Sequence, residues 1–195
     1  MLTLCIDTAY KYLTCALIED ETVIAGYSKE CFKKQSEEVF MAMTEIFNRA
    51  GIKKSDIDSI CISEGPGSYT GVRIAMTIAK TIGDLNGLDV YTISTLRLYA
   101  ANKPDTMVLM DARANRAYVG IYDGENIVMD DCALPLQEID PKAYDVVGDA
   151  SLIGGQDSYP NISNAFLATK PLWKKVDDIA YLTPKYLKES ESYYR

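Results

Sequence analysis

The residues best suited to chemistry lie in a glycine-rich stretch that an arginine follows. The candidate contacts are Gly65, Gly67, Ser68, Thr70, Gly71 and Arg73. The stretch follows an apolar run at 58–63 and precedes a helical pattern at 72–86, which predicts a strand-to-helix junction. Free backbone N–H groups and the helix dipole favour anions at such a junction, so one interpretation is a phosphate site. The other is a tight turn in which glycine lets the helix pack.

Two aspartates, Asp7 and Asp111, directly follow apolar, β-prone segments. In one interpretation they face each other across a cleft and hold Mg²⁺ through water. In the other, each caps the end of its strand by hydrogen-bonding to nearby backbone. Arg113 could pair with either aspartate and close the cleft with an internal salt bridge.

The chain contains no histidine. This excludes Ser-His and Cys-His nucleophile pairs and removes the commonest ligands of catalytic zinc. A peptidase would need an unusual arrangement such as Ser68 with Lys80. The five cysteines form no C-x-x-C pair, and Cys5, Cys15 and Cys61 lie inside apolar runs, so we predict buried, reduced thiols.

The formal net charge is −8, with 20 basic and 28 acidic residues. Such a chain repels phosphate backbones and is a poor candidate for binding nucleic acid alone. No apolar run approaches the roughly 18–20 residues that cross a bilayer. The first residues predict a strand rather than a signal peptide, which favours a cytoplasmic location.

The first half of the chain predicts three strands followed by alternating helices and strands. The strands are expected at Leu2–Ile6, Leu13–Ile18, Thr22–Tyr27, 58–63 and 89–93, and the helices at 36–50, 72–86 and 95–102. Ser36 is the expected cap of the first helix, which Gly51 ends. Short connections between the first three strands favour antiparallel hairpins.

The second half predicts strands at 107–110, 117–122, 126–132 and 144–147, and a terminal helix at 177–189. No element is predicted between 151 and 175. Pro104 marks a boundary, so we expect an N-terminal subdomain of residues 1–102 and a smaller one of residues 103–195, with the terminal helix packing back on the first half.

The string from Gly65 to Ile74, G-P-G-S-Y-T-G-V-R-I, closely resembles the signature of the TsaB family, also called YeaZ-like. Four further segments resemble family motifs in the same order, and the resemblance is strongest over residues 1–123. They are Ile6-Asp7-Thr8-Ala9, Val90–Leu96, Asp111-Ala112-Arg113 with Tyr118, and Pro184-x-Tyr186-Leu187.

The resemblance implies an α/β fold of the actin-like ATPase and ribonuclease H-like superfamily, with two subdomains whose mixed sheets are flanked by helices. It implies a bacterial, cytoplasmic, non-catalytic paralogue of TsaD. Such a protein binds and activates TsaD, together with TsaE, for N6-threonylcarbamoyladenosine formation in tRNAs reading ANN codons. Alone it would form a homodimer, and it would reach tRNA only through the complex.

In this family the partner contact resembles a four-helix arrangement built from the first two long helices of each protein. Apolar residues on the two corresponding helices are therefore the interface candidates. They are Val39, Met43, Val72, Ala75, Met76, Ile78, Ala79 and Ile82. The alternative is that these faces cover the sheet, because both helices must also do so.

TsaD-like proteins carry two metal-binding histidines at i and i+4, and by the resemblance Thr95 and Tyr99 occupy those positions here. Neither is a comparable metal ligand, which implies a lost site. The turns after Asp7 and Asp111 lack the glycine of nucleotide-binding relatives. We therefore predict no firm cofactor, with ATP or ADP and magnesium doubtful, and no independent activity. The alternative function is a stand-alone nucleotide-binding phosphotransferase.

Overall fold

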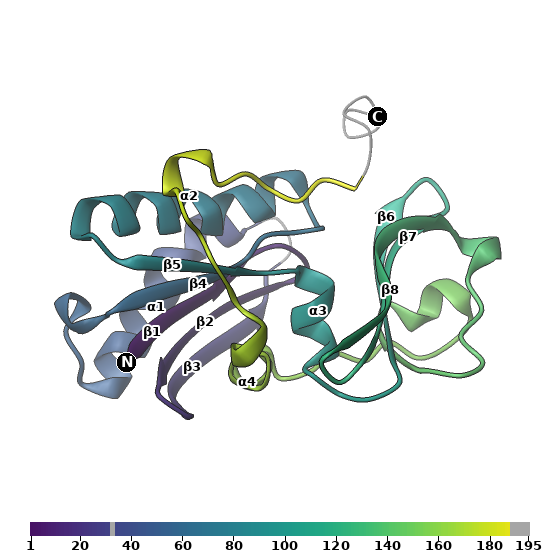
Figure 1. Ribbon diagram of the computed structural model, residues 1–195, viewed down its shortest axis with the longest axis horizontal. Helices are drawn as coiled ribbons and strands as arrows, with labels where there is room; N and C mark the ends of the chain where they lie inside the picture. Colours follow the sequence, from purple (N-terminus) through teal and green to yellow (C-terminus); the bar gives the residue numbers. More distant parts are fainter. Residues whose placement is uncertain (32–33, 188–195) are drawn as a thin grey trace.

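The first sheet has six strands in the order β10-β5-β4-β1-β2-β3 (Figure 1). Its strands are β1 (Leu2–Asp7), β2 (Tyr12–Glu19), β3 (Thr22–Glu30), β4 (Ser59–Ser63), β5 (Asp89–Ile93) and β10 (Lys174–Lys175). β1, β2 and β3 pair antiparallel, whereas β4 is parallel to both β1 and β5. The computed structural model describes residues 1–31 and 34–187.

Helices cover both faces of this sheet, which is why β1 and β4 are buried along their whole length. The long helices α1 (Gln35–Ala50) and α2 (Tyr69–Asn86) pack on one face, where Leu4 and Ile6 of β1 point. The short helices α3 (Thr95–Ala100) and α4 (Ile162–Ala168) pack on the other, where Cys5 points.

The second sheet has four strands in the order β8-β7-β6-β9. They are β6 (Thr106–Arg113), β7 (Arg116–Asp123), β8 (Asn126–Pro135) and β9 (Asp145–Gly148). α3 lies between the two sheets (Figure 1) and shares one hydrophobic core with residues of both, such as Ala16 of β2 and Val108 of β6. The two sheets are thus joined by packed side chains.

The predicted fold class is confirmed: the chain is a mixed α/β protein with two sheets flanked by helices. α2 begins earlier than predicted because Ser68 caps it, its Oγ accepting from the Gly71 N–H. The prediction that Ser36 caps α1 was wrong. The cap residue is Lys34, and its side chain makes no capping hydrogen bond. Gly51 ends α1 in the left-handed conformation with φ of 68°, as expected.

The C-terminal part differs most from the prediction. Over 177–187 the structure has a short 3₁₀ turn, Ile179–Tyr181, and extended chain in place of the predicted helix. Residues 188 and 189 of that prediction lie outside the described residues. Pro184 has no N–H to donate to a helix, and the flanking backbone bonds elsewhere: the Val176 N–H donates to Val90 and the Lys185 N–H to Glu64.

Four of the five cysteines, Cys5, Cys15, Cys31 and Cys61, are buried free thiols, and Cys132 is half-buried and free. The prediction of buried, reduced thiols is confirmed for Cys5, Cys15 and Cys61. Further 3₁₀ turns lie at Lys54–Asp56, Leu136–Glu138, Ala150–Ile153 and Lys170–Leu172. Among the helices of the described residues, none combines the length and the apolar character needed to cross a membrane.

Candidate functional site

The glycine loop packs directly on the end of β1. A Cβ at Gly67 would lie 2.4 Å from the carbonyl oxygen of Ala9, and one at Gly71 would lie 2.3 Å from that of Thr8. These distances are far shorter than a carbon–oxygen contact allows, and main-chain atoms cannot swing aside. Both glycines are therefore needed for the close approach of loop and strand.

Hydrogen bonds of the loop are directed at the chain itself. The Ser68 N–H donates to the Ala9 carbonyl at 2.7 Å, and the Gly71 N–H donates to Ser68 Oγ. Thr8 Oγ1 donates to the Gly71 carbonyl at 2.7 Å and accepts from the Ala75 N–H at 3.1 Å. We therefore interpret the loop as a packed junction rather than an anion site.

Asp7, at the end of β1, is completely buried. Its carboxylate accepts from the Ala9 N–H at 3.0 Å, from Ser63 Oγ at 2.5 Å and from the Tyr99 hydroxyl at 3.1 Å. Burial raises the pKa of Asp7 above its ordinary value, although all three hydrogen bonds act to lower it. Asp7 thus makes the local backbone contact of a strand-end cap.

Asp111 makes the corresponding contact in the other sheet. It accepts from the Arg113 N–H at 2.7 Å and from Arg113 Nη1 at 2.9 Å. The salt bridge predicted for Arg113 is therefore formed with Asp111 and lies at the surface. Within residues 1–31 and 34–187, no group of three or more histidine, cysteine, aspartate or glutamate side chains could hold a metal ion.

Asp149, which the sequence did not single out, organises the junction between the two sheets. Lys11 Nζ donates to it at 2.6 Å, the Asp111 N–H at 2.8 Å, and the hydroxyls of Tyr10 and Tyr159 also donate. Burial raises the pKa of Asp149, but the hydrogen bonds, that of Lys11 foremost, outweigh it, and the pKa lies below its ordinary value. No local motif marks this residue, because Tyr10, Lys11 and Asp111 are far from it in sequence and Tyr159 lies 10 residues away.

Thr95 and Tyr99 are fully buried on α3. The Tyr99 hydroxyl donates to Asp7, and the Thr95 N–H donates to the Gly65 carbonyl at 2.9 Å. The Thr95 hydroxyl has no hydrogen-bond partner among the residues that the structure describes. Thr95 and Tyr99 are thus part of the packing between α3, β1 and the glycine loop.

The interface candidates mainly face the core of the chain, although Val39 and Ile78 also line a hollow between α1 and α2. Seven of them are buried within the chain: Val39, Met43, Val72, Ala75, Met76, Ile78 and Ala79. Ile82 is partly buried and packs against the same core. The physical reason is that α1 and α2 cover the same face of the first sheet, so their main apolar stripes are used to bury it.

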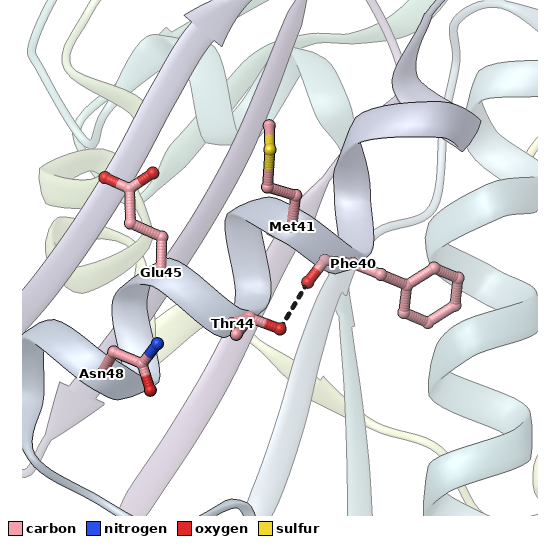
Figure 2. A pocket seen from close by; sticks show the side chains of 5 residues that line it. All are labelled: Phe40, Met41, Thr44, Glu45 and Asn48. Carbon is pink, nitrogen blue, oxygen red and sulfur yellow. Dashed lines mark hydrogen bonds between the residues drawn. The ribbon is translucent and has the colours of Figure 1, made fainter.

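The exposed apolar side chains of these helices lie beside the stripe. Phe40 is 62% exposed and Met41 is 56% exposed. A hollow of about 520 Å³ on α1 is lined by Phe40, Met41, Thr44, Glu45 and Asn48, and Figure 2 shows Phe40 reaching from α1 toward the neighbouring helix. In the sequence, Phe40 and Met41 follow Val39 directly, which places them off the main apolar stripe of α1. This position is the only sign in the sequence that they are exposed.

A hollow of about 460 Å³ lies between α1 and α2. It is lined by Ser36, Val39, Phe40, Tyr69, Thr70, Arg73, Ile74, Thr77 and Ile78. Arg73 extends over the Tyr69 ring, with its guanidinium 5.0 Å from the ring centroid. We call this hollow, together with Met41, the α1–α2 surface. It combines exposed apolar area with a shaped depression, as docking sites do.

A family model described as "TsaD: tRNA N6-adenosine threonylcarbamoyltransferase" matches residues 29–152. The chain is 30% identical to the tRNA threonylcarbamoyladenosine biosynthesis protein TsaB of Bacillus subtilis, over 98% of this chain and 96% of that protein. It is 33% identical to TsaB of Escherichia coli, over 63% of this chain and 55% of that one. The solved structure of YeaZ from Pseudomonas aeruginosa superposes with a TM-score of 0.82 at 20% identity, covering 95% of this chain and 99% of that one.

Proposed function

The chain belongs to the TsaB family, and on that basis we propose that it is a non-catalytic partner that binds and activates a TsaD protein. In this proposal, TsaD then forms N6-threonylcarbamoyladenosine in tRNAs reading ANN codons. The relatives from Bacillus subtilis and Escherichia coli are named as biosynthesis proteins of this nucleoside, which supports a role in the same modification. The α1–α2 surface is the observation that carries the docking part of the proposal.

The shape of that surface suits a partner built like this chain. The TsaD family model matches residues 29–152, a span that contains α1 and α2. A TsaD protein therefore has counterparts of both helices, and two such pairs can pack face to face as a four-helix arrangement. Phe40 and Met41 would be buried in this contact. In the absence of TsaD, a second copy of this chain would use the same surface to form a homodimer.

The interior around Asp7 supports an accessory role. Asp7 is bonded to Ser63, Ala9 and Tyr99, and the loop donors are bonded to Ala9 and Ser68. The phosphotransferase alternative gains no support from this geometry. The peptidase alternative also gains none, because Lys80 Nζ donates to the Ala180 carbonyl while Ser68 Oγ caps α2.

The net charge of −8 supports an indirect route to tRNA. A chain of this charge repels the phosphate backbone, so the RNA contacts of the complex would come from TsaD and from TsaE. The proposal places all three proteins in the bacterial cytoplasm, where tRNA is modified.

The test is reconstitution of tRNA modification from purified TsaD, TsaE and this chain. Phe40→Asp is expected to weaken TsaD binding at least tenfold, because a charge would be buried in an apolar contact. Ile127→Asp is the matched control. Ile127 is 60% exposed, a fraction close to that of Phe40, but it lies on β8 in the second sheet. Full modification activity without this chain would refute the proposal, as would equal binding by both variants.

A further inference from the structure

The C-terminal segment Pro184–Leu187 packs on the glycine loop through main-chain atoms. The Lys185 N–H donates to the Glu64 carbonyl at 2.8 Å. A Cβ at Gly65 would lie 2.7 Å from the Lys185 carbonyl oxygen. The position of this segment is therefore set by the same close backbone packing that shapes the loop.

The side chain of Lys185 holds the segment from the opposite side. Its Nζ lies 2.9 Å from an Asp131 carboxylate oxygen on β8 and 3.7 Å from one of Asp130. The Asp131 side chain is nearly completely buried and also accepts from the hydroxyls of Ser94 and Tyr122. A buried carboxylate with three donors is a rigid anchor, so Lys185 ties the segment to the second sheet.

Tyr186, the next residue, lies against the rim of the α1–α2 surface. Its ring stacks on that of Tyr69, with centroids 5.6 Å apart and an interplanar angle of 18°. Tyr69 lines the hollow between α1 and α2 and carries Arg73 over its ring. Tyr186 remains 41% exposed after this stacking. The side chains of Arg73, Tyr69 and Tyr186 thus continue the docking surface away from α1.

We propose that Tyr186 is a partner-contacting residue and that Lys185 is its positioning residue, so that the C-terminal segment completes the surface that binds TsaD. This inference rests on the proposed function. Tyrosine is enriched among residues that carry most of the energy of an interface. A ring already held by stacking and by a fixed backbone loses little conformational entropy on binding, which favours its use as an anchor.

Binding of the partner TsaD, measured by surface plasmon resonance, tests the proposal. Tyr186→Ala is expected to weaken binding about tenfold, mainly through faster dissociation. Tyr186→Phe keeps the stacked ring and should stay within about twofold of the wild type. Lys185→Met should weaken binding by about threefold to fivefold, because the ring loses its support.

Tyr181→Ala is the matched control. Tyr181 is also an exposed tyrosine, at 81%, but it lies on the preceding 3₁₀ turn, Ile179–Tyr181, and does not line the hollow. This variant should bind TsaD as the wild type does. A photoreactive benzoylphenylalanine at position 186 should cross-link to TsaD, whereas the same group at position 181 should not. A purely structural role for Tyr186 would produce no cross-link.

The two proposals fail in different ways. If the wild type binds TsaD and Tyr186→Ala binds equally well, or position 186 gives no cross-link, only the role of the C-terminal segment is overturned. If the wild type does not bind TsaD, the proposed function fails and this inference fails with it. Should Tyr186→Ala lower the melting temperature, the cross-link and Tyr186→Phe still decide the question.

Discussion

Asp7 and Asp149 are both buried aspartates, each at the end of a strand and each surrounded by hydrogen-bond donors. Asp7 accepts from three neutral groups, and its pKa is raised. Asp149 accepts from neutral groups and from the ammonium of Lys11, and its pKa is lowered. At Asp7 the three neutral donors do not offset the desolvation of the carboxylate, whereas at Asp149 the Lys11 ammonium and the neutral donors together outweigh it.

The comparison gives the two regions opposite pH dependence. For Asp149, the unfolded state binds the proton more tightly. Its contribution to the free energy of unfolding is present above the unfolded pKa and is lost as the pH falls through the folded pKa. For Asp7, the folded state binds the proton more tightly, so its contribution declines as the pH rises from the unfolded pKa to the raised folded pKa. Replacing the aspartate by asparagine should therefore change the stability differently at Asp149 and at Asp7.

The largest effect is expected for Asp149→Asn. Removing the charge takes away the shorter ion pair of Lys11, leaving the one to Asp157 at 3.9 Å, and turns an amide N–H₂ toward groups that donate. The free energy of unfolding should therefore fall by about 2–3 kcal/mol at pH 7. Urea denaturation followed by circular dichroism measures it. Asp130→Asn at an exposed position is the control and should cost less than about 0.5 kcal/mol. An equal loss of stability in both variants would contradict the importance of Asp149 and its hydrogen-bond donors.

Lys11→Met should have the next largest effect, a loss of about 1–2 kcal/mol, because the ammonium is partly exposed and the pair is partly screened. The pKa of Asp149 should then rise, since its main lowering influence is gone. Unfolding measured from pH 4 to pH 8 should show that stability increases less with pH than in the wild type. An unchanged dependence of stability on pH would mean that the hydrogen bonds from the tyrosines, and not the one from Lys11, keep the pKa of Asp149 low.

Tyr99→Phe should cost about 1 kcal/mol, the usual net value of one buried hydrogen bond. The pKa of Asp7 should rise further, because the Tyr99 hydroxyl is one of the three groups that lower it. Carbon-detected NMR of the Asp7 carboxyl group across pH reports this directly. A lower pKa in the variant would show that Tyr99 accepts from a protonated Asp7 and does not donate to it.

The smallest effect is expected for Asp7→Asn, the counterpart of the first substitution. The amide oxygen can still accept from Ala9 and Ser63 and the amide nitrogen can donate to Tyr99, so stability at pH 7 should change by less than about 1 kcal/mol. The decline in stability as the pH rises above the ordinary pKa of an aspartate should become smaller than in the wild type. A loss as large as that of Asp149→Asn would remove the contrast between the two sites.

The sequence predicted the long periodic elements well, because α1 and α2 carry many apolar repeats and end at glycines with positive φ. It could not predict β10, whose two residues are a strand only through pairing with β5. Periodicity shows that a face is apolar and not what covers it, so the sequence left open whether the apolar faces of α1 and α2 meet the sheet or a partner. Phe40 and Met41 became recognisable only when the stripe beside them was seen to be buried.

The Asp149 cluster lay beyond sequence reasoning for a different reason. Its partners Tyr10 and Lys11 are 139 and 138 residues away, and Tyr159 belongs to the stretch in which no element was predicted. No local pattern specifies such a meeting of distant segments. The position of Tyr99 could be inferred from the family resemblance, but its hydrogen bond to Asp7 could not.

The packing of the 3₁₀ turn on α2 affects how the protein is made. Lys80 of α2 donates to Ala180, which is 100 residues further along the chain. A ribosome adds about 5–20 residues per second, so the outer side of α2 waits roughly 5–20 s for the segment that covers it. For most of that interval the residues of both long helices and of the other five strands of the first sheet have been synthesised, whereas those of β10 have not. A ribosome that stalls in the last quarter of the message would therefore present chaperones with a nearly finished domain whose α2 is uncovered.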